Sequence, residues 1–485
     1  MAATLITAGA AYGQVPSTND TSDASYNTGM GSFALGGPAA TNGGTNNTAS
    51  GAYALAANTT GGSNTASGAY ALHNNTTGGE NTAAGYGALD ENTTGGYNTA
   101  YGYGALNQNT TGAGNTASGA YALVANTTGG SNVASGYGAL DSNTTGSSNT
   151  ASGFDALYTN STGANNTASG YGALNANTTG IENTASGANA LLNNTTGNRN
   201  NASGMGALNS NTTADDNNAM GANALYDNTT GTLNNAVGNF AMEYNTTGNN
   251  NNAVGYGAML RNTTGSDNSA QGYEALASNT SGNLNIAIGY KAGFSQTTGS
   301  QNIYLGNTGA AAESNVIRIG SSTGVSTQSA AFIAGISGNV LTGGNVVVTS
   351  SGQLGVTSSS LRYKQDIEPL GDASERLYNL RPVKFRYIKP DEQGQKPVQF
   401  GLIAEEVAEV LPEVVYRNAE GKVEGVRYEE LTPMLVNEVT QQRKQIAALK
   451  QQLAEVTELK QQLAELKTLV ATLAPQAQEV RVAIR

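Results

Sequence analysis

A unit of 17 residues recurs without a break from Asn47 to Asn302, and this repeat limits the folds open to the chain. Its pattern is Asn-[Thr/Asn]-Ala-Ser-Gly-x-x-Ala-Leu-x-x-Asn-Thr-Thr-Gly followed by two variable residues. A fixed short period means that each unit is one coil of a stack and buries its surface only against its neighbours. Helical repeats need about 33 residues or more, whereas short strands separated by Asn-Thr-Thr-Gly and Gly turns fit this length. The repeat therefore predicts an all-β solenoid or β-roll.

Each position in the unit has an expected role. Gly51 and its equivalents allow a bend or a close backbone approach that a Cβ atom would prevent. Ala54 and Leu55 form the apolar anchor, and the Asn47 and Asn58 equivalents are expected to stack from coil to coil as amide ladders.

The residues on either side of the first alanine become more apolar along the chain. Thr and Ser occupy these places early, and aliphatic side chains replace them later: Val237, Val254, Ile286, Ile288, Ile303 and Leu305. We expect the core to become more apolar towards the C-terminal end. Since an early coil with one leucine buries too little apolar surface to offset the ordering of its backbone, we also expect an oligomer.

The last coils resemble a known family. The stretches NIAIGYKAG, QNIYLGN and SNVIRIGSS resemble the Asn-x-x-Ile-Gly repeats in the heads of trimeric autotransporter adhesins, and the resemblance covers roughly residues 47–320. Those heads are left-handed parallel β-rolls, so the resemblance implies a similar roll here.

Composition excludes several functions. The chain has no cysteine and a single histidine, His73, which excludes disulfide scaffolds, cysteine nucleophiles and a Ser-His-Asp triad. The net charge of -12 argues against nucleic-acid and anionic-membrane partners, because both require a basic surface. No run approaches the roughly 20 apolar residues of a membrane span. We expect no cofactor and no bound metal.

Composition also divides the chain. Residues 1–46 form an N-terminal segment whose start, MAATLITAGAAYGQVPS, is either the end of a secretory signal with Ala11 and Gly13 at the cleavage site or an ordinary disordered N-terminus. The repeats fill 47–320, and a β-neck without the period fills 321–357. A separate α/β unit follows at 358–430, then a coiled-coil helix at 431–474 and a tail at 475–485.

Elements of the C-terminal region follow from its patterns. We expect a helix at 372–380, a strand at 381–388, a strand that leads into a helix at 398–412, strands near 414–418 and 423–428, and a long helix from about Tyr428. Apolar residues at 3-4 spacing in that helix, with one three-residue step, predict a coiled coil: Ile446, Leu449, Leu453, Val456, Leu459, Leu463, Leu466, Val470 and Leu473. Pro475 is expected to end it.

The border SSSLRYKQDI, residues 358–367, carries a candidate catalytic pair. Ser359 and Lys364 lie five residues apart with Arg362 between them. A lysine amine can deprotonate a serine if burial or a neighbouring cation lowers its pKa. Spacing alone equally fits a linker followed by a solvated basic turn.

More motifs downstream carry a second resemblance. SSLRYKQDIEPL, LRPVKFRY, FGLIAEEVAEVLPEVV and VRYEELTPMLVNEV resemble, in order, the endosialidase-type intramolecular chaperone of phage tailspikes and tail fibres. In that family the domain trimerises β-stranded chains and then cuts itself off by a Ser-Lys dyad. The resemblance implies Ser359 as nucleophile, Lys364 as base and a cut between Ser358 and Ser359. Arg362, Gly401 and Glu406 match supporting family residues, and Glu405 stands at a further supporting position.

Two positions depart from that family pattern. Ser360 stands where phage members often have Asp, and Glu405 replaces a Gln. Neither change touches the dyad itself, but the two changes leave the efficiency of cleavage open. A chaperone that trimerises without cutting therefore stays an alternative.

Other motifs have competing interpretations. The Asn-Thr-Thr triplets fit glycosylation acceptors, but their fixed place in each coil favours a turn and ladder role. A tyrosine series could bind sugars or form a structural stack: Tyr53, Tyr70, Tyr86, Tyr103, Tyr121 and Tyr137. The carboxylates Asp90, Glu91, Asp215 and Asp216 are interpreted as loop variation rather than a glycosidase pair. No Thr-x-Thr row for ice binding and no calcium-binding repeat is present.

These observations predict a homotrimeric fibre that is extracellular, at a cell surface or on a virion. Its function would be display or adhesion. A cell-surface glycan or host receptor would be its ligand. An uncleaved trimeric adhesin and a carbohydrate-active β-solenoid enzyme are the alternatives.

Overall fold

The computed structural model describes residues 21–39, 44–320, 346–348, 354–356, 358–390, 394–418 and 420–482. The chain forms two compact units, Met1–Phe332 and Ile333–Arg485. The expected N-terminal signal lies outside the described residues, as does the β-neck except for one antiparallel hairpin, β20 (Val346–Val348) with β21 (Leu354–Val356).

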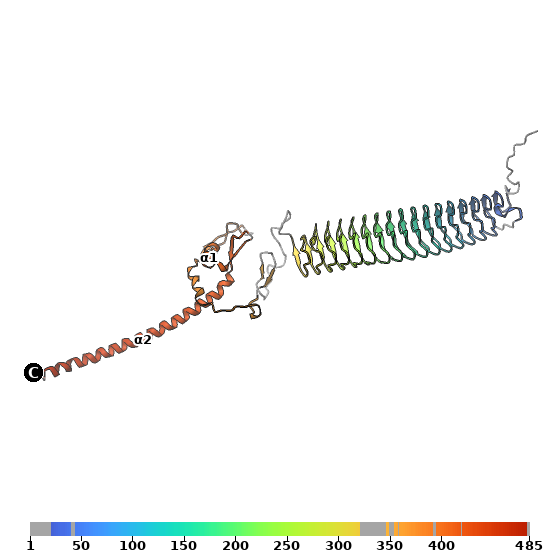
Figure 1. Cartoon of the computed structure of the whole chain (residues 1–485). Coiled ribbons are helices and arrows are strands. Elements are labelled where there is room, and N and C mark those ends of the chain that lie inside the picture. Colours follow the sequence, from blue (N-terminus) through green and yellow to red (C-terminus); the bar gives the residue numbers. More distant parts are fainter. Residues whose placement is uncertain are drawn as a thin grey trace, which may run out of the picture. The chain divides into compact units, whose positions relative to one another are not determined.

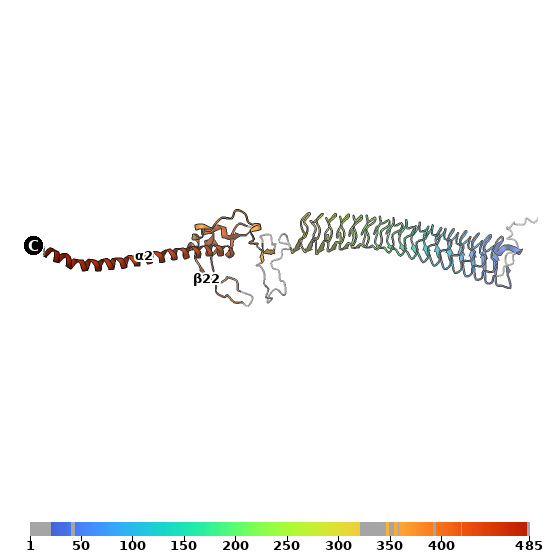
Figure 2. The ribbon, with the colours of Figure 1, turned by 90° about the horizontal axis from the view of Figure 1, so that it is seen from below.

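The first unit is the predicted solenoid. Short strands stack in parallel, one from each coil, and each pairs in register with the next (Figures 1 and 2). A short antiparallel strand β1 (Thr21–Ser22) and a 3-10 helix η1 (Ala34–Ala39) lie at its start. The strands of the stack are β2 (Thr28–Met30), β3 (Thr48–Ser50), β4 (Thr65–Ser67), β5 (Thr82–Ala84), β6 (Thr99–Tyr101), β7 (Thr116–Ser118), β8 (Val133–Ser135), β9 (Thr150–Ser152), β10 (Thr167–Ser169), β11 (Thr184–Ser186), β12 (Asn201–Ser203), β13 (Asn218–Met220), β14 (Asn235–Val237), β15 (Asn252–Val254), β16 (Ser269–Gln271), β17 (Ile286–Ile288), β18 (Ile303–Leu305) and β19 (Ile317–Ile319).

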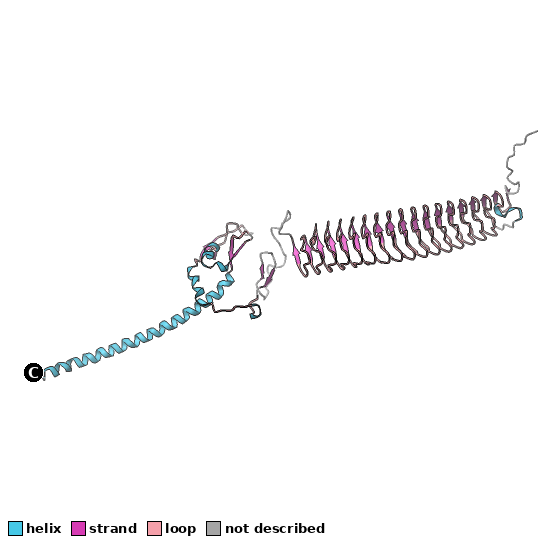
Figure 3. Cartoon of the chain, in the orientation of Figure 1, coloured by secondary structure: helices cyan, strands magenta, loops and turns pink. Residues whose placement is uncertain are grey.

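Neighbouring coils are also joined outside the strands, in the turns drawn as loops in Figure 3. Leu55 N–H donates to the carbonyl of Ala71 at 3.0 Å, and Thr59 N–H donates to that of Thr76 at 2.9 Å. Backbone pairing around the coil explains the strict period, because an inserted residue would leave buried N–H and C=O groups unpaired.

Two ladders of buried asparagines confirm the amide stacking predicted for the Asn47 and Asn58 positions. Asn166 Nδ2 donates to Asn149 Oδ1 at 3.2 Å, and Asn177 Nδ2 donates to Asn160 Oδ1 at 2.7 Å. Both amides also donate to the carbonyl of Gly180, at 2.8 and 3.0 Å. Since Asn177 begins an Asn-Thr-Thr triplet and is fully buried, the triplet serves the turn and ladder rather than a glycan.

The core of each coil is small. The prediction that the core becomes more apolar towards the C-terminal end, through the aliphatic residues beside the first alanine, is wrong. Ala168, Ala173 and Leu174 are fully buried, as are their equivalents. Ile286 and Ile288, which were expected to enrich the core, are 40% and 45% exposed. Successive side chains of a strand point to opposite faces, and the buried middle place belongs to the alanine. The isoleucines therefore face outward.

Glycine is required at one corner of the coil. Gly170 has φ of +136°, and a Cβ there would lie 2.6 Å from the carbonyl oxygen of Gly187. This confirms the close approach predicted for the glycine of the repeat. The neighbouring Leu174 has φ of 53°, a conformation costly for leucine that was not predicted. Its complete burial offsets the cost.

Aromatic side chains stack along the solenoid. The rings of Tyr53 and Tyr70 lie 5.2 Å apart with planes at 9°, and those of Tyr86 and Tyr103 lie 5.4 Å apart at 10°. Other neighbours in the series meet edge to face, such as Tyr70 with Tyr86 at 64° and Tyr103 with Tyr121 at 68°. Contacts of both kinds occupy ring surface that a sugar would otherwise contact. The arrangement favours the structural ladder over a sugar-binding rail.

The second unit has the α/β pattern that the sequence predicts. Its elements are the 3-10 helices η2 (Leu361–Tyr363), η3 (Gly371–Asn379) and η4 (Pro412–Val414), the strands β22 (Val383–Phe385), β23 (Gln399–Gly401), β24 (Val415–Arg417) and β25 (Val423–Val426), and the helices α1 (Ala404–Val410) and α2 (Tyr428–Val482). Strand β22 pairs with β23 and β24 with β25, both antiparallel.

Two details of this unit differ from expectation. The segment predicted as an α-helix at 372–380 is the 3-10 helix η3. Helix α2 continues through Pro475, where it was expected to end. A proline removes one backbone donor, and the turns on both sides of it continue the helix.

A small apolar core holds the unit together. It consists of side chains from α1, η4, β24 and α2: Val407, Leu411, Val414, Val415, Leu431 and Met434. Only the first turns of α2 contribute to it. Further along, α2 exposes its apolar residues, and Leu453, for instance, is 65% exposed.

Candidate active site

The candidate nucleophile and base lie on either side of a tight turn at the start of the α/β unit. Tyr363 N–H donates to the carbonyl of Ser360 at 3.0 Å, and Lys364 N–H donates to that of Leu361 at 3.2 Å. These bonds form the single 3-10 turn η2, which lies between Ser359 and Lys364. A 3-10 turn rises only about 2 Å per residue, so it keeps the two residues on either side of it close in space.

The turn places Lys364 against Ser359. The Lys364 Nζ donates to the Ser359 Oγ at 3.0 Å, which is hydrogen-bond distance for a nucleophile and its base. Both side chains are exposed in the single chain. The structure thus brings together the two residues that the sequence singled out.

Arg362 contacts other residues of the turn. Its Nε donates to Ser360 Oγ at 3.3 Å, and its guanidinium lies 5.5 Å from the ring centre of Tyr363. Ser360 N–H in turn donates to Ser358 Oγ at 3.4 Å. The arginine therefore shapes the turn on the side that carries Ser360, the residue that departs from the family pattern.

The remaining predicted site residues lie in the α/β unit and support its fold. A Cβ on Gly401 would lie 2.7 Å from the Tyr428 hydroxyl, which itself accepts a hydrogen bond from Leu402 N–H at 2.8 Å. Glu406 pairs with Arg381, and hydrogen bonds from this guanidinium lower the pKa of Glu406. Glu405 is exposed in the first turn of α1.

Sequence reasoning missed a polar cluster that joins η3 to α2. Glu438, only 7% exposed, accepts hydrogen bonds from Ser374 Oγ at 2.5 Å and from the Tyr378 hydroxyl at 2.6 Å. Asn437 Nδ2 donates to Ser374 Oγ at 2.6 Å. The one signal in the sequence that could have indicated this cluster is the polar pair Asn437 and Glu438, which lies between two valines on α2.

The solenoid carboxylates do not form a hydrolytic pair. Asp216 accepts from Arg199 Nε at 2.7 Å, and Asp215 accepts from Asn198 N–H at 2.7 Å. Asp90 lies 3.3 Å from His73 Nδ1, and burial raises its pKa. These partners lie on neighbouring coils, as expected for loop variation.

One comparison with known proteins identifies part of the second unit. Residues 359–416 match the model of the family described as chaperone of endosialidase. These residues form an intramolecular chaperone domain. The match begins at Ser359, the predicted nucleophile, and ends in β24, so the chaperone domain covers β22 to β24.

The other comparisons add no relative. No curated protein matches the chain, and no solved structure does. Among the residues that the structure describes, no helix is long and apolar enough to cross a membrane.

Proposed function

We propose that the chain is a subunit of a trimeric fibre whose chaperone domain drives assembly and then cuts itself off between Ser358 and Ser359. The observation that carries this proposal is the 3.0 Å contact of Lys364 Nζ with Ser359 Oγ at the first residue of the chaperone match. The solenoid before the cut is then the mature fibre, and the domain after it is released.

The cleavage chemistry uses only these two side chains and water. Neutral Lys364 takes the proton of Ser359 Oγ, which attacks the carbonyl carbon of Ser358 through a small ring. The Ser358–Ser359 C–N bond breaks, and the Ser359 nitrogen receives the proton back and becomes an amine. Water then hydrolyses the ester, so that Ser358 keeps a carboxylate and the hydroxyl of Ser359 is restored.

Exposed apolar surfaces in both units support association of identical chains. The stripe on α2 that predicts a coiled coil is exposed throughout, from Ile446 at 51% to Leu473 at 51%. On the last coils, Ile317 and Ile319 are 67% and 71% exposed. Since apolar surface of this kind marks interaction sites, both surfaces are interpreted as contacts between copies.

Cleavage after assembly would make the product persist. A parallel solenoid depends on contacts distant in sequence and forms slowly, so an assembling domain helps it. Removal of that domain then makes assembly a one-way step. A fibre of this type acts at a cell surface or on a virion, where it binds a glycan or a receptor.

The decisive experiment compares full-length variants by denaturing electrophoresis. Wild type and the control Lys389→Ala, at an exposed lysine away from the turn, should yield two fragments, whereas Ser359→Ala and Lys364→Ala should stay intact, with cleavage slowed roughly 100-fold or more. Sequencing of the smaller fragment should begin at Ser359, and a different first residue would move the cut. Intact wild-type chains would contradict the peptidase and favour the uncleaved adhesin.

A further inference from the structure

The segment Ser358–Leu370, here called the cleavage segment, has almost no packing within its own chain. All its residues are exposed except Ser360, which is half-buried. Its apolar side chains share this exposure, with Leu361 at 73%, Tyr363 at 70% and Ile367 at 62%. Large apolar side chains gathered on so short a segment indicate a missing partner surface.

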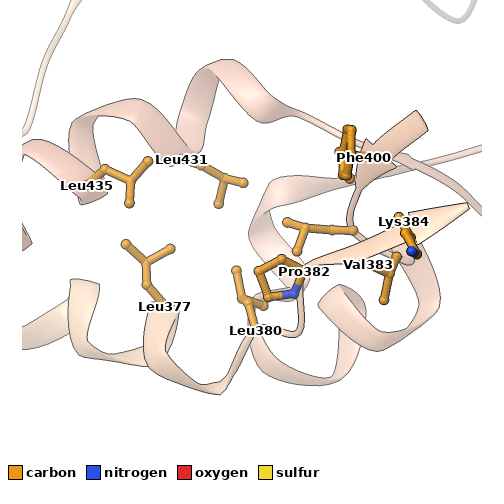
Figure 4. Close-up of a pocket in the computed structure, with 10 residues that line it drawn as sticks. Leu377, Leu380, Pro382, Val383, Lys384, Phe400, Leu431 and Leu435 are labelled. Atoms are coloured by element: carbon orange, nitrogen blue, oxygen red, sulfur yellow. The ribbon is translucent and has the colours of Figure 1, made fainter. Parts of the chain in front are cut away.

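An apolar pocket of matching character lies in the second unit, between the chaperone domain and the start of α2. It has a volume of about 660 Å³, in the range of clefts that hold a ligand. Figure 4 shows Leu377 of η3 and Leu435 of α2 facing each other across it, with Phe400 at one end. Phe400 is 82% exposed and Leu435 is 54% exposed, so the pocket is open in the single chain.

Charge at the pocket complements charge in the segment. Lys384 is the one charged residue among those that line the pocket. In the cleavage segment, Asp366 and Glu368 flank Ile367 on both sides. If Ile367 enters the pocket, a carboxylate comes within reach of the Lys384 amine, and opposite charges favour this orientation.

We propose that the pocket binds the cleavage segment of a second copy of the chain, with Ile367 as the apolar anchor. The inference rests on the proposed function, whose site it completes. The exposed stripe of α2 brings copies together, and each copy then offers an open pocket and an unpacked segment. Residues that pack against the segment would exclude water near Ser359 and Lys364, and burial favours the neutral amine that a base requires. Cleavage is then coupled to assembly.

Complementation between chains tests this coupling. Ile367→Asp and Phe400→Asp chains should each cleave at least tenfold more slowly than wild type, while Ile388→Asp, a change at a residue 91% exposed outside the pocket, should cleave normally. In mixtures of differently tagged variants, the Phe400→Asp chains should be cut, because their intact segments reach the intact pockets of Ile367→Asp chains. Normal cleavage of both variants, or no rescue in the mixture, would overturn the proposal.

A second measurement does not depend on cleavage. The chain has no cysteine, so Ile367→Cys on one tagged copy and Phe400→Cys on another, both with Ser359→Ala, give an unambiguous disulfide test. The proposal predicts a mixed crosslinked dimer, and Ile388→Cys in place of Phe400→Cys should not form it. If the cysteine variants crosslink but the wild-type chain is not cleaved, the self-cleavage proposal is refuted and the docking proposal stands. If the wild-type chain is cleaved but the cysteine variants do not crosslink, only the docking proposal is refuted.

Discussion

Single side chains carry specific tasks in both units. In the solenoid, Asn166 hydrogen-bonds to the coil before it and the coil after it, and its burial makes each lost bond costly. In the second unit, Glu438 of α2 accepts two hydroxyl hydrogen bonds from η3 and so ties that element to α2. These polar residues hold backbone segments in place where apolar packing is sparse.

Glu438 should make the stability of the second unit depend on pH. A hydrogen bond from Ser374 and, to a smaller extent, one from Tyr378 lower the pKa of Glu438 below the usual 4.5. A lowered carboxyl pKa contributes stability above the unfolded-state value, and this contribution is lost as pH falls through the folded-state value. Thermal unfolding of α2, followed by circular dichroism in the Ser359→Ala chain, should show a loss of stability below about pH 4.5.

The matched variant is Glu438→Gln, which keeps the shape and removes the titration. It should be less stable than the parent at neutral pH and should show a smaller drop on acidification. Equal acid sensitivity of both chains would assign the effect to other carboxylates.

At the scale of elements, the coil is the unit of folding in the first half of the molecule. Most coils repeat the same backbone bonds, two asparagines and one Ala-Ala-Leu core, and late coils vary it with Met242, Met259, Gln296 and Tyr304. Each coil packs against its neighbours. Stability in such a stack is a sum over coils and their interfaces. Whole coils are therefore interchangeable, but parts of a coil are not.

Deletion variants test this modularity. Removal of residues 166–182 joins Asn165 to Asn183 and restores the repeat, so the β-sheet circular dichroism per residue and the melting temperature should change little. Removal of 166–173 alone places a turn against a strand and should lower the melting temperature markedly, because buried backbone groups lose their partners. Similar behaviour of the two deletions would argue against register pairing as the source of stability.

At the scale of the whole molecule, association of chains is expected to depend mainly on α2. Only its start packs on the chaperone domain, and its apolar stripe has no partner among the described residues of the single chain. A helix this long with a 3-4 apolar pattern is stable in water when copies wind together.

The double variant Leu453→Asn, Leu463→Asn should abolish the trimer, since both leucines lie on the exposed stripe. Sedimentation in the Ser359→Ala background should show a shift from three chains to one, while Gln452→Asn, off the stripe, should leave three. A trimer that persists in the double variant would place the main contact on the solenoid coils instead.

Much of the candidate site could be predicted from the chain alone, because its residues are close in sequence. Ser359 and Lys364 are brought together by one turn, so their spacing already contained the contact. The pocket and the Glu438 cluster could not be predicted this way. Each of them joins residues about 60 apart, such as Ser374 and Glu438, and only the packing of η3 on α2 brings these residues together.

The sequence by itself determined the solenoid and its 17-residue period, since a strict repeat leaves one way to pair neighbouring backbones. Only the tertiary structure decided which side of each strand is inside. In a strand of three residues, the alternation of polar and apolar side chains is too short to show which face is buried. The apolar character of Ile286 and Ile288 therefore led to the prediction that they belong to the core. The narrow interior accepts the alanine between them, so the isoleucines face outward, where only another surface can cover them.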